Sequence, residues 1–181
     1  MGAEKRLKEL GIELPDLPKP VANYVRSVRV GHLLFLAGHG PHKDGQLTFI
    51  GKLGREVTVE QGQQAARLVG LNLLASTREA LGSLDRVARI VKVLGMVNSA
   101  EGFGDQPKVI NGFSDLMVDV FGEAGRHARS AVGMAELPFG IAVEIEMIVE
   151  VADGGTARPS ARRRTRPTRR PTQRAATRRR R

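Results

Sequence analysis

The stretch from residue 143 to residue 150 alternates apolar and polar side chains. Every second position is apolar, and three of the four positions between them are glutamates. A period of two is typical of a β-strand with one buried face, and we expect helices to cover the apolar face. Residues 128–134 predict a second strand. Because the segment 138–140 (PFG) predicts a tight connection, we expect the two strands to form a β-hairpin.

Apolar residues at helical spacing predict two long helices. The first follows Thr58, whose side chain can cap it, and ends at about Leu81. The second has Pro107 in its first turn and ends at Gly122. The other predicted elements are a short helix at 3–10 and strands at 24–30, 33–37, 47–50 and 87–93. The order β-β-(β)-α-β-α-β-β predicts an α+β domain, in which a mixed sheet carries two helices on one face.

The positive charge of the chain is concentrated at its end. The chain carries a net charge of +10, but 12 of its 29 basic residues and one of its 19 acidic residues follow Ala152. The preceding part therefore carries 17 basic and 18 acidic residues, a net charge of −1. We divide the chain into a helix with a proline-rich lead-in (1–19), a folded domain (20–152) and an arginine-rich tail (153–181). The tail has too few apolar residues to fold.

Three interpretations of the tail stay open. It is a solvated segment without a partner, an arm that makes weak contacts with nucleic-acid phosphates, or a GC-rich sequence read out of frame. Electrostatic binding to phosphates requires only positive charge. The tail has no aromatic residue for base stacking, however, and no lysine.

Composition and spacing exclude several kinds of site. The chain has no cysteine, which excludes disulfides and thiolate chemistry. No stretch is long and apolar enough to cross a membrane and the first residues are charged, so we expect a cytoplasmic protein without membrane contacts. Residues 45–52 lack the spacing of a phosphate-binding loop. His39 and His42 have no carboxylate at ligand spacing, so we expect no metal.

Three short segments with fixed spacing resemble the C-terminal signature of the Rid family, the reactive intermediate deaminases of YjgF type that are also labelled L-PSP endoribonucleases. They are ARS at 128–130, LP at 137–138 and VEIE at 143–146. The resemblance covers about residues 20–151. It is closest to a divergent branch of the family with GKxG and HARSAVG segments, found here at 51–54 and 127–133.

The resemblance implies five pocket residues. Arg129 would hold the carboxylate of the substrate, and Glu144 would orient a water molecule, so these two are the expected catalytic residues. Tyr24, Gly38 and Asn111 would join Arg129 in binding the substrate. The alternatives are that Tyr24 is a strand aromatic, that Asn111 is a helix-surface residue, and that Arg129 and Glu144 form a salt bridge between subunits.

The chain departs from the pattern of the family at several positions. His39 replaces a glutamine, Ala37 replaces a small hydroxyl residue, and Ala131 stands where many members have cysteine. Loops at about 42–57 and 98–108 are longer than in the common deaminases. With alanine at residue 131, any role of that thiol is absent.

The resemblance implies a chorismate-mutase-like homotrimer, with helices outside a central barrel. The implied reaction is hydrolysis of a small 2-imino or enamine acid, for which no cofactor is needed. A non-catalytic module that binds small carboxylic acids through Arg129 is the main alternative. An endoribonuclease ranks last, because the folded part is nearly neutral and has no histidine pair at the pocket.

The predicted hairpin separates the two expected catalytic residues. If residues 138–140 close it, Arg129 and Glu144 lie five residues apart along the strands, roughly 16 Å. One small substrate cannot contact both within one chain. We therefore expect the site to combine Arg129 of one subunit with Glu144 of its neighbour. Within its own strand, Arg129 shares a face with Ala131 and Gly133, whose small size would leave room for a planar acid.

Overall fold

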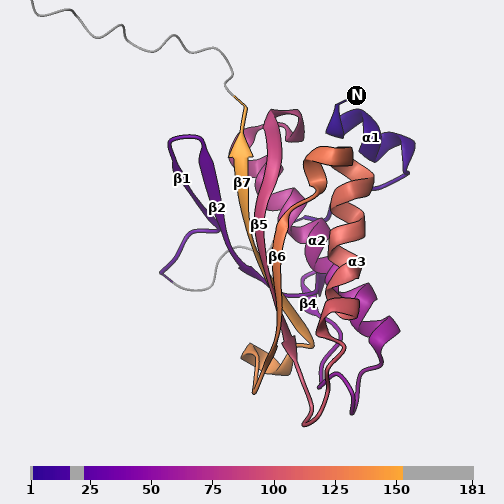
Figure 1. The fold of residues 1–181 in the computed structure, drawn as a ribbon. Helices are drawn as coiled ribbons and strands as arrows, with labels where there is room; N and C mark the ends of the chain where they lie inside the picture. Colours follow the sequence, from indigo (N-terminus) through magenta and orange to yellow (C-terminus); the bar gives the residue numbers. More distant parts are fainter. Residues whose placement is uncertain (1, 17–22, 153–181) are drawn as a thin grey trace, which may run out of the picture.

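A five-stranded sheet lies against two long helices in the computed structural model (Figure 1). The structure describes residues 2–16 and 23–152, so the predicted boundary at residue 19 and the predicted tail lie outside the described residues. The elements are α1 (Ala3–Glu9), β1 (Ser27–Val30), β2 (Leu33–His39), β3 (His42–Lys43), β4 (Gln46–Leu47), α2 (Val59–Leu81), η1 (Leu84–Arg86), β5 (Val87–Asn98), α3 (Gln106–Phe121), η2 (Gly122–Gly125), β6 (Ala128–Met134), η3 (Pro138–Gly140) and β7 (Val143–Val151).

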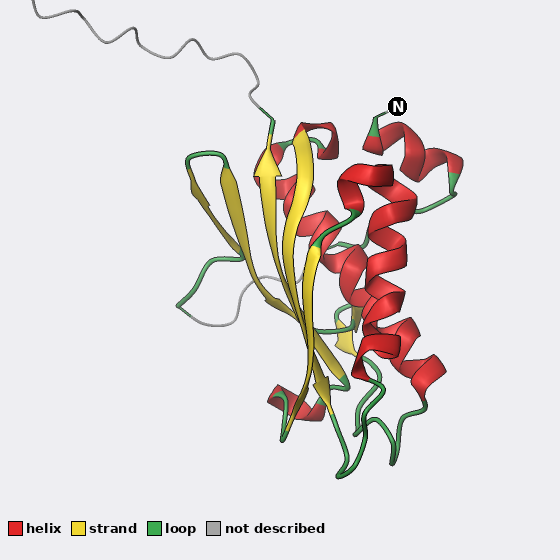
Figure 2. Ribbon diagram, viewed as in Figure 1, coloured by secondary structure: helices red, strands yellow, loops and turns green. Residues whose placement is uncertain are grey.

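The sheet has the strand order β1-β2-β7-β5-β6. All neighbouring pairs are antiparallel except β5 and β6, which are parallel. Helices α2 and α3 lie side by side on one face of the sheet, and α1 packs near the end of α3 (Figure 2). No described α-helix covers the opposite face, which we call the uncovered face. The predicted α+β class with two helices on one face of a mixed sheet is confirmed.

The predicted hairpin of β6 and β7 is wrong. Both strands pair with β5 instead, β6 on one side and β7 on the other. Helix α3 returns the chain to the start of β5, which makes β6 parallel to β5 and places it at the edge. The 138–140 segment is a short 3₁₀ turn with Phe139 at φ 58° and Gly140 at φ 68°. It leads the chain past β5 rather than folding it back on β6.

The alternation predicted for β7 is confirmed. Val143, Ile145, Met147 and Val149, which share one face of the strand, are at most 1% exposed. They pack with α2 in one hydrophobic core, and the strand has a neighbour on each side. A strand with one face fully buried fits the centre of a sheet better than its edge.

Both long helices form for the reasons that the sequence indicates. Thr58 accepts a hydrogen bond from the Gln61 backbone N–H (3.2 Å), and the Gln61 side chain accepts one from the Thr58 backbone N–H (2.9 Å). This is the predicted capping box. The helix ends at Gly82, which adopts a left-handed conformation (φ 80°). Pro107 lies in the first turn of α3, where its missing N–H costs no hydrogen bond.

Several strand boundaries differ from the predictions, including that of β2, which continues to His39 instead of ending at residue 37. β1 begins at Ser27 rather than at residue 24, and β5 continues to Asn98 because it pairs with strands on both sides. The predicted strand at 47–50 is replaced by the short β3–β4 pair and one bridge from Ile50. Phe49 interrupts the extended backbone there with φ 55°.

The GKLG segment at 51–54 contacts the end of the sheet at which β5 and β6 finish. Lys52 Nζ donates hydrogen bonds to Asn98 Oδ1 (2.9 Å) and to the carbonyl of Ala135, and it pairs with Glu136 (3.0 Å). Lys52 therefore joins the loop at about 42–57 to β5 and to the β6–β7 connection.

In the described ranges 2–16 and 23–152, no helix is long and apolar enough to cross a membrane.

Candidate functional site

The guanidinium of Arg129 is held by one side of α3. Its Nη1 donates to Asn111 Oδ1 (3.0 Å) and to Ser114 Oγ (2.9 Å), and its Nη2 donates to the carbonyl of Pro107 (3.3 Å). Residues 107, 111 and 114 are spaced by four and three, so they lie along one face of the helix. Three acceptors on a rigid helix fix both the position and the plane of the guanidinium.

Arg129 keeps part of its hydrogen-bonding capacity for another group. A guanidinium has five N–H donors, and these three bonds use both donors of Nη1 and one of Nη2. The Nε–H and the second Nη2–H have no acceptor among residues 2–16 and 23–152. Two N–H groups in a fixed plane suit the two oxygens of a carboxylate. Arg129 is therefore a preformed candidate anion site at the edge of the sheet.

The small residues that follow Arg129 on its face do not leave the expected empty space. Ala131 packs against the hydrophobic core. A Cβ at Gly133 would lie 2.9 Å from Gln106 Nε2 and 3.0 Å from Ser99 Oγ. The small residues make room for the start of α3 and the loop before it. Any ligand of Arg129 must therefore approach from the open edge of β6.

Glu144 lies on the uncovered face of the sheet and contacts the backbone of β2. A Cβ built on Gly38 would lie 2.0 Å from Glu144 Oε1, so the carboxyl group occupies the space that a side chain would fill. Burial raises the pKa of Glu144 above its ordinary value, and the nearby charge of Glu146 raises it further. Gly38 and Glu144 are thus brought together, as the predicted pocket requires.

Arg129 and Glu144 lie on opposite faces of the sheet. Arg129 is level with Val93, which is fully buried in the core, and its side chain reaches α3. Glu144 lies between the buried residues Val143 and Ile145 and points away from the helices. The expected separation of roughly 16 Å was derived from a hairpin that does not form, because β5 lies between the two strands. Since the two side chains lie on opposite faces of the sheet, one small substrate cannot contact both within one chain.

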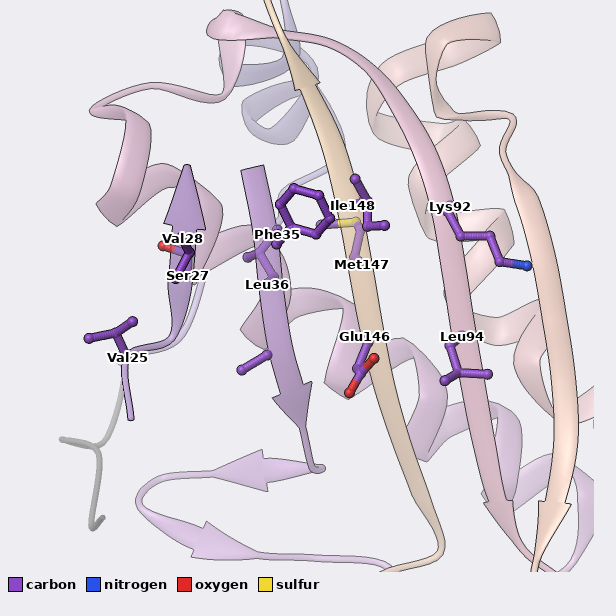
Figure 3. A pocket seen from close by; sticks show the side chains of 11 residues that line it. Val25, Ser27, Val28, Phe35, Leu36, Lys92, Leu94, Glu146, Met147 and Ile148 are labelled. Atoms are coloured by element: carbon purple, nitrogen blue, oxygen red, sulfur yellow. The ribbon is translucent and has the colours of Figure 1, made fainter. Parts of the chain in front are cut away.

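The uncovered face has an apolar hollow of ≈ 330 Å³. Figure 3 shows Val28, Phe35 and Ile148 side by side across β1, β2 and β7, and below them Glu146 on β7 beside Leu94 on β5. Tyr24 lies outside this hollow, just before β1, and is 52% exposed. In the described chain it is not close to Arg129 or Asn111, since it lines a depression beside Glu79 of α2.

Two residues of the Arg129 site were not predicted from the sequence. Ser114 accepts a hydrogen bond from Arg129, and it also contacts His127 Nε2 (3.1 Å). The spacing of Ser114 from Asn111 on a predicted helix was a usable signal for the first contact. The Pro107 carbonyl carries no sequence signal at all, because any residue has one. No group of three or more potential metal ligands (His, Cys, Asp or Glu) occurs in the described parts of the chain.

Comparison with known proteins places this geometry in a family. Residues 4–150 match the family described as "YjgF/chorismate mutase-like, putative endoribonuclease". Protein TCP17 of Trypanosoma cruzi is 48% identical over 146 residues, covering 80% of this chain and 91% of that protein. The crystal structure of Atu1372 from Agrobacterium tumefaciens, a protein of unknown function, is 46% identical, covers 82% of this chain and 91% of that chain, and gives a TM-score of 0.75.

A more distant relative carries the name of an activity. The 2-iminobutanoate/2-iminopropanoate deaminase of Dermatophagoides farinae is 29% identical over 140 residues, which cover 77% of this chain and 94% of that protein. The family match spans most of the chain and includes both the sheet and the Arg129 site. The chain belongs to the YjgF/Rid family.

Proposed function

We propose that the chain is a hydrolytic deaminase that converts small, reactive 2-imino and enamine acids to 2-oxo acids and ammonia. The observation that carries this proposal is the guanidinium of Arg129, which α3 fixes in place with two N–H donors left over. Such a group binds one planar carboxylate and orients the atom next to it. The relative named as an imine deaminase supports a reaction of this class.

In the proposed reaction, Glu144 acts on the water that attacks the substrate. The carboxylate takes a proton from the water as the water oxygen bonds to the carbon of the protonated imine, and it returns this proton to the nitrogen of the resulting carbinolamine. As the C–N bond breaks and ammonia leaves, the carboxylate takes the remaining hydroxyl proton, and the oxygen becomes the carbonyl of the 2-oxo acid. The carbon of a protonated imine is already electrophilic, so the reaction needs no cofactor. The raised pKa of Glu144 favours both accepting and releasing a proton nearer to neutral pH.

We further propose that the protein is a homotrimer with the helices outside a central barrel. Arg129 and Glu144 lie on opposite faces of one chain, so a site that uses both requires Arg129 from one subunit and Glu144 from the next. The uncovered face supports the assembly, since Val28 is 53%, Val30 63% and Phe35 40% exposed there. Apolar side chains grouped on one surface are typical of a protein interface.

The test is a panel of imino acids generated in the assay by an amino-acid oxidase, with ammonia release as the readout. The protein should accelerate release, and Arg129→Ala should abolish the acceleration. Arg129→Lys should be nearly as impaired, because lysine keeps the charge but loses the planar pair of donors. Wild-type protein that leaves the rate unchanged for every imino acid would contradict the proposal.

A non-catalytic module that binds small carboxylic acids is the second candidate. It is favoured by the position of Arg129, whose donors are preformed without any contribution from Glu144. Glu144→Gln separates the two candidates: a deaminase loses hydrolysis, whereas a binding module retains its affinity for 2-oxo acids and has no hydrolysis to lose. An endoribonuclease is less favoured, since both ring nitrogens of His39 and of His127 are engaged within the fold.

A further inference from the structure

His127 lies two residues before Arg129, in the segment that joins η2 to β6. Its Nδ1 lies 2.7 Å from the carbonyl oxygen of Gly125, and its Nε2 lies 3.1 Å from Ser114 Oγ. The same hydroxyl oxygen lies 2.9 Å from Arg129 Nη1. Ser114 therefore connects the imidazole directly to the guanidinium of the proposed site.

The direction of each hydrogen bond in this chain follows from the chemistry of the groups. A carbonyl oxygen only accepts, so His127 Nδ1 must carry the hydrogen. A guanidinium only donates, so Ser114 Oγ accepts from Arg129. The Nε2 of an uncharged imidazole then has a free lone pair and accepts the hydroxyl hydrogen of Ser114. The chain thus runs in one direction, from Arg129 through Ser114 and His127 to the carbonyl of Gly125.

The far end of this chain is rigid. A Cβ at Gly125 would lie 2.1 Å from the carbonyl oxygen of Met117, so the backbone of η2 is pressed against the end of α3. The ring of Phe113 meets the imidazole edge-on, with centroids 5.9 Å apart and planes at 74°. These contacts restrict both the carbonyl that accepts from Nδ1 and the plane of the imidazole.

The surroundings of the imidazole also favour its uncharged form. Burial lowers the pKa of His127; the hydrogen bond to Gly125 opposes this in part, and the positive charge of Arg129 lowers the pKa further. The other charged groups beside it on η2 and the following residue are Glu123 and Arg126, which pair with each other at 3.0 Å. An uncharged ring keeps its Nε2 lone pair for Ser114.

We propose that His127 is a positioning residue, which fixes the Arg129 guanidinium by orienting the Ser114 hydroxyl so that its oxygen accepts from Nη1. Without the imidazole, the hydroxyl is free to turn toward other acceptors, and Arg129 loses one of the three bonds that hold it. This inference rests on the proposed function only for its ligand. The hydrogen-bond chain itself can be tested without any ligand.

The test without ligand uses NMR spectra of the intact protein. A long-range ¹H–¹⁵N spectrum should show His127 as the Nδ1–H tautomer at neutral pH. His127→Phe, which keeps the ring and removes both nitrogens, should shift the Arg129 side-chain resonances and speed up their hydrogen exchange. An Nε2–H tautomer, or unchanged Arg129 resonances in His127→Phe, would overturn the proposal.

The matched control is His39 at the end of β2, which has the same arrangement with a serine of the other long helix, α2. Its Nδ1 lies 2.7 Å from the carbonyl of Ala37 and its Nε2 lies 2.6 Å from Ser76 Oγ. His39→Phe removes an equivalent link between a strand and a helix, and it should leave the Arg129 resonances unchanged. An equal shift in both variants would show a general loss of packing and would overturn the assigned role.

The test with ligand uses calorimetry with pyruvate, the simplest stable 2-oxo acid. We expect His127→Phe and Ser114→Ala each to weaken binding about five- to tenfold, the usual effect of one lost hydrogen bond. His127→Gln can place an amide oxygen near the Nε2 position and should restore most of the affinity. The double variant should bind like Ser114→Ala alone, because His127 acts only through Ser114.

Additive losses in the double variant, or single variants that bind like wild type, would overturn the role of His127. Wild-type protein that fails to bind pyruvate would count against the proposed function instead. In that case the tautomer and the Arg129 resonances still decide whether His127 positions the arginine, so the two failures are distinguishable.

Discussion

At the scale of single residues, Glu144 depends on a neighbour that has no side chain. Gly38→Ala would place a Cβ 2.0 Å from Glu144 Oε1, and the carboxyl group lies at the end of a flexible side chain that can move away. We therefore expect little change in the unfolding midpoint but a loss of about 10²-fold in the proposed hydrolysis, because the carboxyl group proposed to act on the water is displaced. Chemical denaturation and steady-state kinetics measure the two effects; full activity in Gly38→Ala would show that Glu144 need not occupy this position.

Glu146 should set the lower pH limit of the reaction. The proposed reaction needs the carboxylate form of Glu144, so its rate should fall as the pH drops through the pKa of that group. Burial and the charge of Glu146 raise this pKa above its ordinary value, so we expect the acidic limb of the rate profile at a higher pH than for an exposed glutamate. Glu146→Gln removes the like charge and should move the limb to lower pH.

The control for this pH profile is Glu150→Gln on the same strand, where the glutamate is half exposed and pairs with Arg89 at 3.9 Å. It should leave the limb in place. If Glu146→Gln leaves the limb unmoved as well, Glu144 is not the group whose titration limits the rate.

At the scale of elements, α2 and α3 approach each other through a glycine. A Cβ at Gly112 would lie 2.1 Å from the carbonyl oxygen of Gln63, and this atom belongs to rigid helix backbone. Alanine normally stabilises a helix by roughly 1 kcal/mol relative to glycine. Here we expect Gly112→Ala to lower the free energy of unfolding by about 2–3 kcal/mol, since the helices must separate.

Gly104→Ala is the control for this substitution, because a Cβ there meets no atom within 4 Å. Its unfolding free energy should stay within about 0.5 kcal/mol of wild type, as is usual for surface changes. Urea denaturation compares the three proteins. A Gly112→Ala protein as stable as wild type would show that the two helices can shift without cost.

The sequence predicted the elements better than their pairing. The two long helices and the buried face of β7 follow from local spacing, because a cap or an apolar period depends on neighbours within a few residues. The position of β6 depends on the path of α3 across the sheet, and no residue in the 138–140 turn encodes that path. Because β6 and β7 are adjacent in sequence and joined by a tight turn, we predicted that they pair with each other, whereas both pair with β5.

For the candidate site, too, the individual residues were easier to predict than which of them lie together. Arg129 and Asn111 were predicted as pocket residues, and the structure brings them together; Gly38 and Glu144 also meet, but on the other face of the sheet. Which predicted residues share a surface depends on pairing and on side-chain direction at an edge strand. The contact of Ser114 with His127 joins two elements and carries no signal in either segment alone.

At the scale of the whole molecule, the proposed shared site predicts complementation. Arg129→Ala and Glu144→Ala proteins should each be inactive. If they are unfolded together and refolded as mixed trimers, about one quarter of the sites receive both intact residues in a symmetric oligomer. Ammonia release should recover accordingly. A mixture of Arg129→Ala with Arg129→Lys is the control, since no site in it receives an intact Arg129. If mixed trimers form in the first mixture but ammonia release does not recover, the site is not shared between subunits.

The arginine-rich end of the chain should be dispensable for the domain. A chain that ends at Ala152 loses 12 arginines and one aspartate, and the rest is nearly neutral. We expect this shorter chain to keep its melting temperature and oligomer size. Any binding of RNA or DNA by the full chain should disappear with the tail and weaken steeply with salt. Calorimetry, light scattering and filter binding test these expectations, and nucleic-acid binding by the shorter chain would contradict them.

The central position of β7 has a consequence for how the protein folds. Without β7, the strand order separates into two pairs, β1–β2 and β5–β6, which share no hydrogen-bonded edge. The five-stranded sheet is therefore complete only when β7, the last strand in the described part of the chain, enters between two pairs that precede it in the sequence. Because its partners are distant in sequence, we expect this insertion to limit the rate of refolding. Until it occurs, β2 and β5 each present an open edge to other chains, and this is the stage at which the protein should be most prone to aggregate.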